Sequence, residues 1–286
     1  DMEHSMSAAS SPDHSRLIER LAGRLRWRGA VDGVSAGQGR GSRSAASGEF
    51  DNHARWCPGD DLHRLDLRVW LRLRQRWTRS YRDDSSEPLT IILDGGASMG
   101  FGDKPQAVSW TCELFLAVAR SRRDPHRLWI LDDGNARVAL PGDRSGVATR
   151  GDLRSALQRV EPTGSGPGRV VMISDRIVFD DLDDQLQGLN RWAKPIWISP
   201  WLPEEVTPTA SGQVRLEAKQ EPPWIGTIDR SSCQRYRQQF DRYQRALRSW
   251  LTRRGGSHLP IDASQQGEAL LRPLLHRSGP LEVVSG

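Results

Sequence analysis

The spacing of apolar residues along the chain predicts strands that alternate with helices. Short apolar runs, typical of buried strands, occupy residues 89–93, 127–131, 136–140, 169–174 and 195–199. Helices are expected between and after them, at residues 104–122, 151–160, 182–192, 230–254 and 266–275. Alternating strands and helices of this length predict an α/β fold with a doubly wound, mostly parallel sheet of the Rossmann type.

Two further segments precede this predicted domain. Residues 16–27 carry three leucines spaced four apart, which predicts one face of a helix. Residues 29–48 contain six glycines and no apolar period, which is typical of a flexible connection. We therefore divide the chain into an N-terminal extension of helix and Gly/Ser-rich linker (1–48), an Arg-rich segment (49–88) and an α/β domain with its C-terminal helices (89–286).

The Arg-rich segment has a pattern of its own. From Leu65 to Leu73 every second residue is apolar and three of the four residues between them are charged. This period of two predicts a strand for at least part of the stretch. Residues 64–82 hold seven arginines with two tryptophans and a tyrosine between them, a composition that suits contacts to phosphates and stacking on bases. Neighbouring aspartates could instead pair with these arginines within the protein. The segment is therefore either a nucleic-acid-binding surface or a charged strand face.

Composition narrows the class of protein. The 286 residues are 36% hydrophobic and 27% charged, and no run approaches the ~20 apolar residues that a membrane helix needs. The start of the sequence lacks the apolar stretch of a secretory signal, and Cys57, Cys112 and Cys233 show no paired spacing. We therefore expect a cytoplasmic protein without a membrane span. The net charge of +5 is modest for this length and does not by itself indicate a nucleic-acid partner.

Polar residues follow the predicted strands at the place where an open α/β sheet binds ligands. That crevice lies beyond the carboxyl ends of the strands. Four residues are candidates to meet there: Asp94, Ser98, Thr149 and Asp175. Their oxygens suit a hard cation such as Mg²⁺. Asp94 precedes two glycines, however, and also fits a tight turn, while Ser98 could cap a helix and Asp175 could simply end its strand.

Several motifs resemble one family of bacterial proteins. They are "PGDDLHRLD" (58–66), the nearby Arg72, "ILDGGASM" (92–99), Lys104 and "ISD" (173–175). Together they resemble the domain-of-unknown-function family 58, whose members have a von Willebrand factor A-like domain, and the resemblance covers most of the chain from residue 49 onward. It implies a metal-ion-dependent adhesion site, in which one aspartate, two serines, a threonine and a second aspartate surround Mg²⁺ and leave a position for a partner's carboxylate.

Carried over position by position, this resemblance assigns Asp94, Ser98 and Asp175 to the metal site, with Thr149 as a looser match. Gly96 stands where the middle serine is usual. Because glycine has no side-chain oxygen, water would have to fill that place and the affinity for Mg²⁺ should fall. Leu67 likewise replaces the family's usual tryptophan.

Three functions follow from these observations. The resemblance implies a non-enzymatic protein-interaction module that acts with a MoxR-type AAA+ ATPase in the assembly or maturation of a protein complex. Nucleic-acid binding through residues 64–82 is the first alternative. The second is a hydrolase in which Asp94 and Asp175 hold a metal-bound water. It ranks last, because the sequence offers no general base and contains no H-E-x-x-H, G-x-S-x-G or Walker motif.

Overall fold

A computed structural model describes residues 12–29, 50–55, 67–73, 75, 77–81, 87–139, 151–164, 168–178, 181–209, 211–218 and 221–283. The chain forms two compact units. Residues 1–35 and 87–286 make up the larger unit, and residues 36–86 make up the smaller one. The predicted division at residues 48 and 88 stays a prediction.

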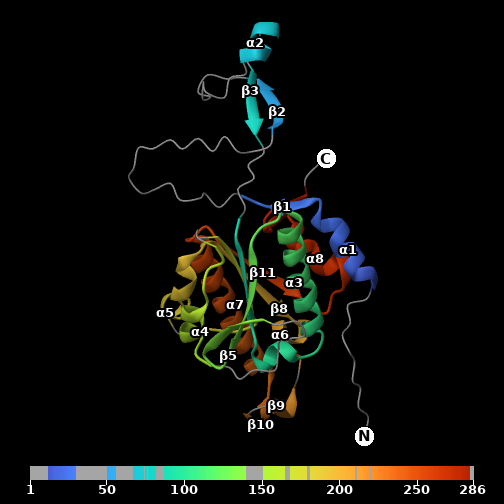
Figure 1. Cartoon of the computed structure of the whole chain (residues 1–286). Coiled ribbons are helices and arrows are strands. Elements are labelled where there is room, and N and C mark those ends of the chain that lie inside the picture. The colour runs from blue at the N-terminus through green and yellow to red at the C-terminus, as the bar shows by residue number, and fades with distance from the viewer. Residues whose placement is uncertain are drawn as a thin grey trace. The chain divides into compact units, whose positions relative to one another are not determined.

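The larger unit is built around a six-stranded sheet (Figure 1). Its strands are β4 (Leu89–Asp94), β5 (His126–Asp132), β6 (Asn135–Val138), β7 (Arg169–Ile173), β8 (Ala193–Trp201) and β11 (Ser257–Asp262). Their order in space is β11, β8, β7, β4, β5, β6, and every neighbouring pair is parallel except β5 with β6. The predicted α/β fold with a mostly parallel sheet is therefore confirmed.

The one antiparallel pair of this sheet comes from a tight turn. Asp133 and Gly134 join β5 to β6, and both have positive φ angles, of 46° and 73°. Two successive residues with positive φ form the type I′ turn that matches the twist of a hairpin, and Asp-Gly is a favoured sequence for it. This turn between the two predicted strands reverses the chain and puts β6 at the edge of the sheet.

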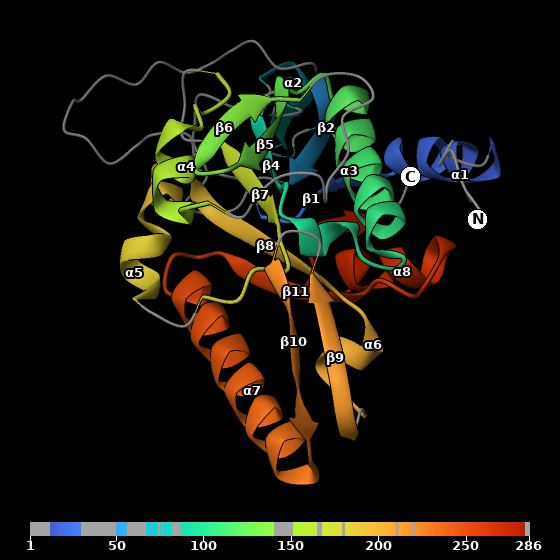
Figure 2. The same ribbon diagram turned by 90° about the horizontal axis from the view of Figure 1, so that it is seen from below.

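Helices cover both faces of the sheet (Figure 2). On one side lie α3 (Lys104–Ser121), α8 (Gly267–Leu275) and α1 (Pro12–Ala22), which packs against α3. On the other lie α4 (Leu153–Arg159), α5 (Leu182–Gln185) and α7 (Arg230–Thr252). This cover explains why β4 is buried along its whole length. Among the described residues, no helix is both long and apolar enough to cross a membrane.

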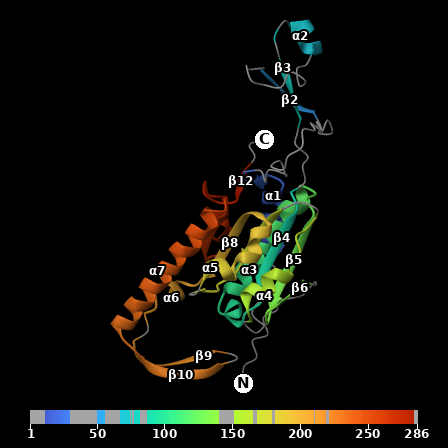
Figure 3. The same cartoon turned by 90° about the vertical axis from the view of Figure 1, so that its left-hand side faces the viewer.

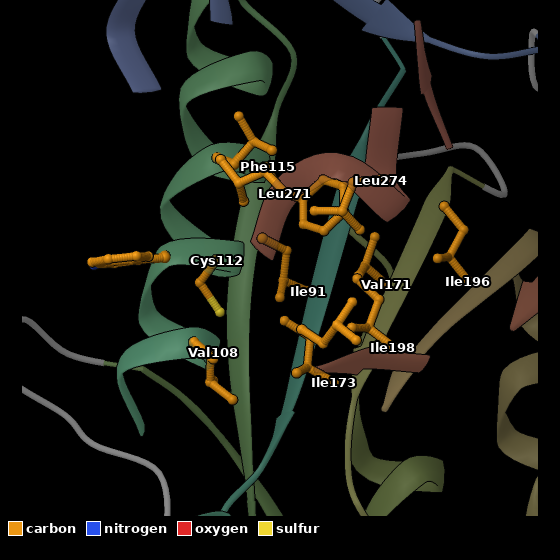
Figure 4. Close-up of a cluster of buried hydrophobic side chains, with 14 of the residues drawn as sticks. Ile91, Val108, Cys112, Phe115, Val171, Ile173, Ile196, Ile198, Leu271 and Leu274 are labelled. Carbon is orange, nitrogen blue, oxygen red and sulfur yellow. The ribbon is translucent and has the colours of Figure 1, made fainter. Parts of the chain in front are cut away.

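The core between the sheet, α3 and α8 is shown in Figure 4. Ile91 of β4 and Val171 of β7 point into it, and Phe115 of α3 and Leu271 of α8 meet them from the helical side. All four side chains are 0% exposed. Burial stabilises each such side chain by about 1.5–3 kcal/mol relative to exposure, so this layer fixes the strands whose ends carry the candidate site.

The N-terminal helix is shorter than predicted. It ends at Ala22, and residues Leu25–Trp27 form the strand β1, which pairs antiparallel with β12 (Leu281–Val283). The helix predicted through residue 27 is therefore wrong beyond Ala22. Leu25 and Trp27 are buried and Arg26 between them is exposed, and this alternation suits a strand once a partner strand is present.

The smaller unit contains β2 (Phe50–Arg55), α2 (Leu67–Leu73) and β3 (Trp77–Tyr81), and β2 pairs antiparallel with β3. The strand predicted within residues 65–73 is wrong for Leu67–Leu73, which are helical. Leucine and arginine are good helix formers, and these two residue types make up five of the seven positions of α2. The alternating pattern therefore did not decide the local structure. The strand of this region, β3, begins after the helix, at Trp77.

Several elements of the larger unit had no sequence prediction. They include the strands β11 and β12 and the hairpin of β9 (Gly212–Ala218) and β10 (Glu221–Ile228). The helix expected at 182–192 is divided into α5 and the 3₁₀ helix η3 (Gln187–Arg191). Another 3₁₀ helix, η2 (Ala97–Gly100), and the short helix α6 (Pro203–Val206) follow the carboxyl ends of β4 and β8.

Candidate functional site

The candidate site lies where the connections of the sheet change direction. From β4 the chain builds the sheet outward through β5 and β6, and from β7 it builds the opposite half through β8 and β11. The crevice between β4 and β7, beyond their carboxyl ends, is the place where folds of this kind bind ligands. Asp94 is the last residue of β4, and Ser174 and Asp175 directly follow β7.

Asp94 is held by four hydrogen-bond donors although it is only 1% exposed. The backbone N–H of Gly96 donates to its Oδ1 at 3.0 Å, and the Ser174 hydroxyl donates to its Oδ2 at 2.7 Å. Arg176 contributes Nε at 3.2 Å from Oδ2 and Nη2 at 3.4 Å from Oδ1. The arginine is itself anchored, since its Nη1 donates to the carbonyl of Gly151 at 2.6 Å.

These contacts keep Asp94 ionised inside the protein. Burial alone would raise the pKa of this carboxyl group. The positive charge of Arg176 and the hydrogen bonds from Arg176, Ser174 and Gly96 act in the opposite direction, and the net result is a pKa below the ordinary value of 3.8. Asp94 is therefore a buried carboxylate whose counter-ion is supplied by the protein.

The second carboxylate, Asp175, has a different cation. The hydroxyl of Ser98 donates to its Oδ1 at 2.7 Å, and Lys104 Nζ lies 2.6 Å from its Oδ2. The same Nζ lies 2.6 Å from Glu205 Oε1 of α6. The side chains of Lys104 and Asp175 are 0% and 2% exposed. A lysine buried to this degree is held by its ionic partners, because an unpaired ammonium group would be strongly disfavoured there.

Two tyrosines of α7 connect that helix to the site. The hydroxyl of Tyr243 donates to the carbonyl of Arg176 at 2.6 Å, and that of Tyr236 donates to the carbonyl of Glu205 at 2.7 Å. Glu205 also accepts the N–H of Leu202 at 2.9 Å. The two ion pairs, Asp94 with Arg176 and Asp175 with Lys104, are thus braced by elements from both halves of the sheet. We call these two pairs the ionic floor.

The structure brings together only part of the predicted ligand set. Ser98 and Asp175 are in direct contact, and Asp94 is bonded to Ser174, the neighbour of Asp175. Thr149 lies outside the described residues. Gly96 does take part, but through its backbone N–H and in the tight turn that the sequence allowed. Asp94 therefore ends a buried strand, and its carboxylate also accepts a hydrogen bond from the turn that follows.

Sequence reasoning missed the cations that complete the site. Arg176 directly follows Asp175, so its position next to a strand end was a usable signal. Lys104 appeared only as part of the family resemblance, with no role attached. Glu205 had no signal at all, because it is 101 positions away from Lys104 along the chain.

The observed contacts do not fit a magnesium ion. Mg²⁺ needs oxygen ligands at about 2.1 Å in octahedral geometry, whereas each of the two aspartates already has a protein cation as its partner. A divalent ion beside Arg176 and Lys104 would be repelled by both. The described residues also contain no group of three or more histidine, cysteine, aspartate or glutamate side chains placed to hold a metal. The predicted Mg²⁺ site stays a prediction, which these contacts do not favour.

The other two predicted functions gain no support at this place. A hydrolase would need a metal-bound water at Asp94 and Asp175, and both carboxylates are already paired with cations. In the segment 64–82, the described part comprises α2, Gln75 and β3. Most of the arginine and aromatic side chains of this segment lie outside the part of the chain that the structure describes. Nucleic-acid binding there stays a prediction.

Exposed apolar side chains follow the carboxyl ends of the same strands. Phe101, just after η2, is 57% exposed, and Val206, which ends α6, is 37% exposed. Trp224 and Ile225 of β10 are 51% and 64% exposed, and their hairpin projects from this end of the unit (Figures 1 and 3). A Cβ at Gly226 would clash with the Trp224 ring, so the indole lies over Gly226 of the same strand. Trp224 and Ile225 are consecutive residues of a strand, so their side chains point to opposite faces of the hairpin. We call these four exposed side chains the apolar rim.

Comparison of this chain with protein families, with curated proteins and with solved structures found no match in any of the three.

Proposed function

We propose that this chain is a non-enzymatic protein-interaction module of the von Willebrand factor A type, and that its partner docks on the apolar rim. The observation that carries the proposal is the exposure of Phe101, Trp224 and Ile225 at the end of the sheet where such folds bind ligands. Large exposed apolar side chains at the ligand-binding end of a fold are candidates for protein contacts.

The composition of the rim supports a protein as the partner. Aromatic residues, tryptophan above all, are enriched at the centres of protein interfaces and supply much of their binding energy. The Trp224 ring also packs over Gly226 of the same strand, which restricts the rotation of its side chain. A side chain that is rigid before binding loses less entropy when the partner arrives.

The ionic floor supports a role in holding the rim rather than in catalysis. Lys104 joins Asp175 to Glu205 of α6, the helix that ends in Val206 of the rim. Ser98 belongs to η2, which immediately precedes Phe101. The salt bridge from Lys104 to Glu205 and the hydrogen bond from Ser98 to Asp175 therefore tie the ionic floor to two of the elements that carry rim residues.

The partner implied by the family resemblance is a MoxR-type AAA+ ATPase, with which the module would act in the assembly or maturation of a protein complex. We place this action in the cytoplasm, where a free buried thiol such as Cys112 stays reduced.

The experiment is a binding titration between the full chain and a purified MoxR-type ATPase, recorded by biolayer interferometry in the presence of ATP. The rim variant carries Trp224→Asp and Ile225→Asp. The matched control carries Val283→Asp in β12, which is 54% exposed and belongs to a different part of the surface.

We expect the wild type and the Val283 variant to bind with equal affinity. The rim variant should bind at least about tenfold more weakly, because each of two interface anchors is replaced by a charge. Equal affinities of the rim variant and the control would refute the rim as the docking site. Absence of binding by the wild type would refute the ATPase as the partner.

A further inference from the structure

The outer face of α7 carries more arginines than acidic side chains. The helix contains six arginines and a single acid, Asp241. All six arginines are exposed. Among the described residues none of them forms an ion pair, and only Arg235 has a side-chain hydrogen bond, to Ser232 at 3.3 Å. Surface helices usually intersperse charges of both signs, since like charges three or four positions apart repel.

The same face contains almost nothing apolar. The buried side chains of α7 are Phe240, Tyr243, Leu247, Trp250 and Leu251, and they face the core. Between the exposed arginines lie glutamine, serine and threonine, with Ala246 as the only exposed apolar residue after the first turn. Figure 3 shows α7 on the outside of the larger unit, and its N-terminal half extends beyond the sheet. The arginine face is therefore polar, positive and accessible.

We infer that this arginine face binds the sugar-phosphate backbone of a nucleic acid. Interfaces with nucleic acids are more polar and more positive than those between proteins, whose centres are depleted of charge. Arginine matches phosphate with two parallel hydrogen bonds, and glutamine, serine and threonine are also common phosphate donors. A membrane would require an apolar side to insert, and the apolar side of α7 is already used in the core.

The dimensions of the helix agree with this partner. From Arg235 to Arg248 the helix rises about 20 Å at ~1.5 Å per residue. Along one strand of duplex DNA a phosphate occurs about every 3.4 Å of axis, so the face spans roughly six phosphates. These contacts involve no base edge, which predicts binding with little dependence on sequence.

The inference concerns a different surface from the apolar rim and from the segment 64–82. It does not depend on the proposed ATPase partner. The arginines of α7 and the rim residues are different side chains, so each set can be substituted without changing the other.

The test is fluorescence anisotropy of a labelled, mixed-sequence DNA duplex of about 20 base pairs, longer than the face requires, titrated with the full chain at several salt concentrations. The α7 variant carries Arg237→Gln, Arg242→Gln and Arg245→Gln. These three side chains are exposed and have no bond within the described structure, so the fold should be kept. A lysine version of the same three positions preserves the charge.

A control removes the same charge from another helix. Arg16→Gln, Arg20→Gln and Arg24→Gln change three exposed arginines of α1 and the turn after it. Both triple variants lower the net charge from +5 to +2, three positive charges fewer. A separate variant, Asp241→Asn, removes the single acid of α7 and should increase the affinity for DNA. An unfolded protein could not produce such an increase.

With about four phosphate contacts, the affinity of the wild type should fall ~100-fold between 50 and 200 mM salt. The α7 variant should bind at least about tenfold more weakly and lose most of this salt dependence, with a slope smaller by about 3. The α1 control and the lysine version should resemble the wild type, and Asp241→Asn should bind more tightly.

Several outcomes would overturn the inference. One is the absence of DNA binding by the wild type at low salt. Another is an equal loss of affinity in the α7 variant and the α1 control, which would show that only the net charge matters. A third is an unchanged affinity of the α7 variant, which would mean that DNA contacts another surface. Binding to phosphatidylserine vesicles or to polyglutamate, without binding to DNA, would assign the face to a different polyanion.

Discussion

Replacing Lys104 by methionine tests the ionic floor directly. Methionine has a similar length and packs well in apolar surroundings, so the change mainly removes the ammonium group that lies 2.6 Å from both Asp175 and Glu205. The side chain of Asp175 is 2% exposed, whereas that of Glu205 is 24% exposed. Asp175 is therefore the carboxylate that would suffer most from losing its counter-ion.

The expected cost follows from burial. Removing one partner of a buried ion pair typically destabilises a protein by about 3–5 kcal/mol, because the other charge stays buried without compensation. Asp175 keeps its hydrogen bond from Ser98, and Glu205 can turn toward water. We therefore expect a loss near the lower end, about 3 kcal/mol, in the free energy of unfolding at pH 7.

Urea unfolding followed by tryptophan fluorescence measures this loss. The double variant Lys104→Met with Asp175→Asn removes both charges and should recover most of the stability, since a neutral pair carries no uncompensated charge. A loss below about 1 kcal/mol for the single variant would place Lys104 in a solvated environment and refute the reasoning. The same conclusion would follow if the double variant were no more stable than the single one.

Two further predictions concern groups near the sheet. Burial, and then the charge of Arg248, lower the pKa of His258 to about 4. The unfolded chain therefore binds more protons between about pH 6.5 and pH 4, and the free energy of unfolding should fall by up to about 3 kcal/mol as the pH drops through this window. His258→Gln should flatten that slope in urea titrations at several pH values, and an unchanged slope would contradict the assignment. Isothermal titration of Mg²⁺ should give no saturable heat, because Arg176 and Lys104 already hold the aspartates; saturable binding that is lost in Asp94→Ala would restore the metal interpretation.

Much of the fold could be predicted from local patterns. The continuous apolar run of β4 predicted a strand buried on both faces, and β4 is buried throughout. The helix predicted at residues 230–254 agrees with α7, Arg230–Thr252, in position and length. Prediction failed where a pattern was short. Leu25 continues a helical spacing but pairs with β12, and Leu67–Leu73 resemble an alternating strand but form a helix. In such short segments tertiary partners and intrinsic propensity outweigh periodicity.

The sequence by itself determined that Asp94 and Asp175 end buried parallel strands, since this follows from apolar runs and from the polar residues after them. Only the tertiary structure decided what neutralises them. Lys104 is 71 positions from Asp175 and 101 from Glu205, and Arg176 is 82 from Asp94. Ion pairs over such separations leave no periodic trace in a single sequence. They exist because packing of the helices on the sheet brings those side chains into a low-dielectric interior, where each charge must find a partner.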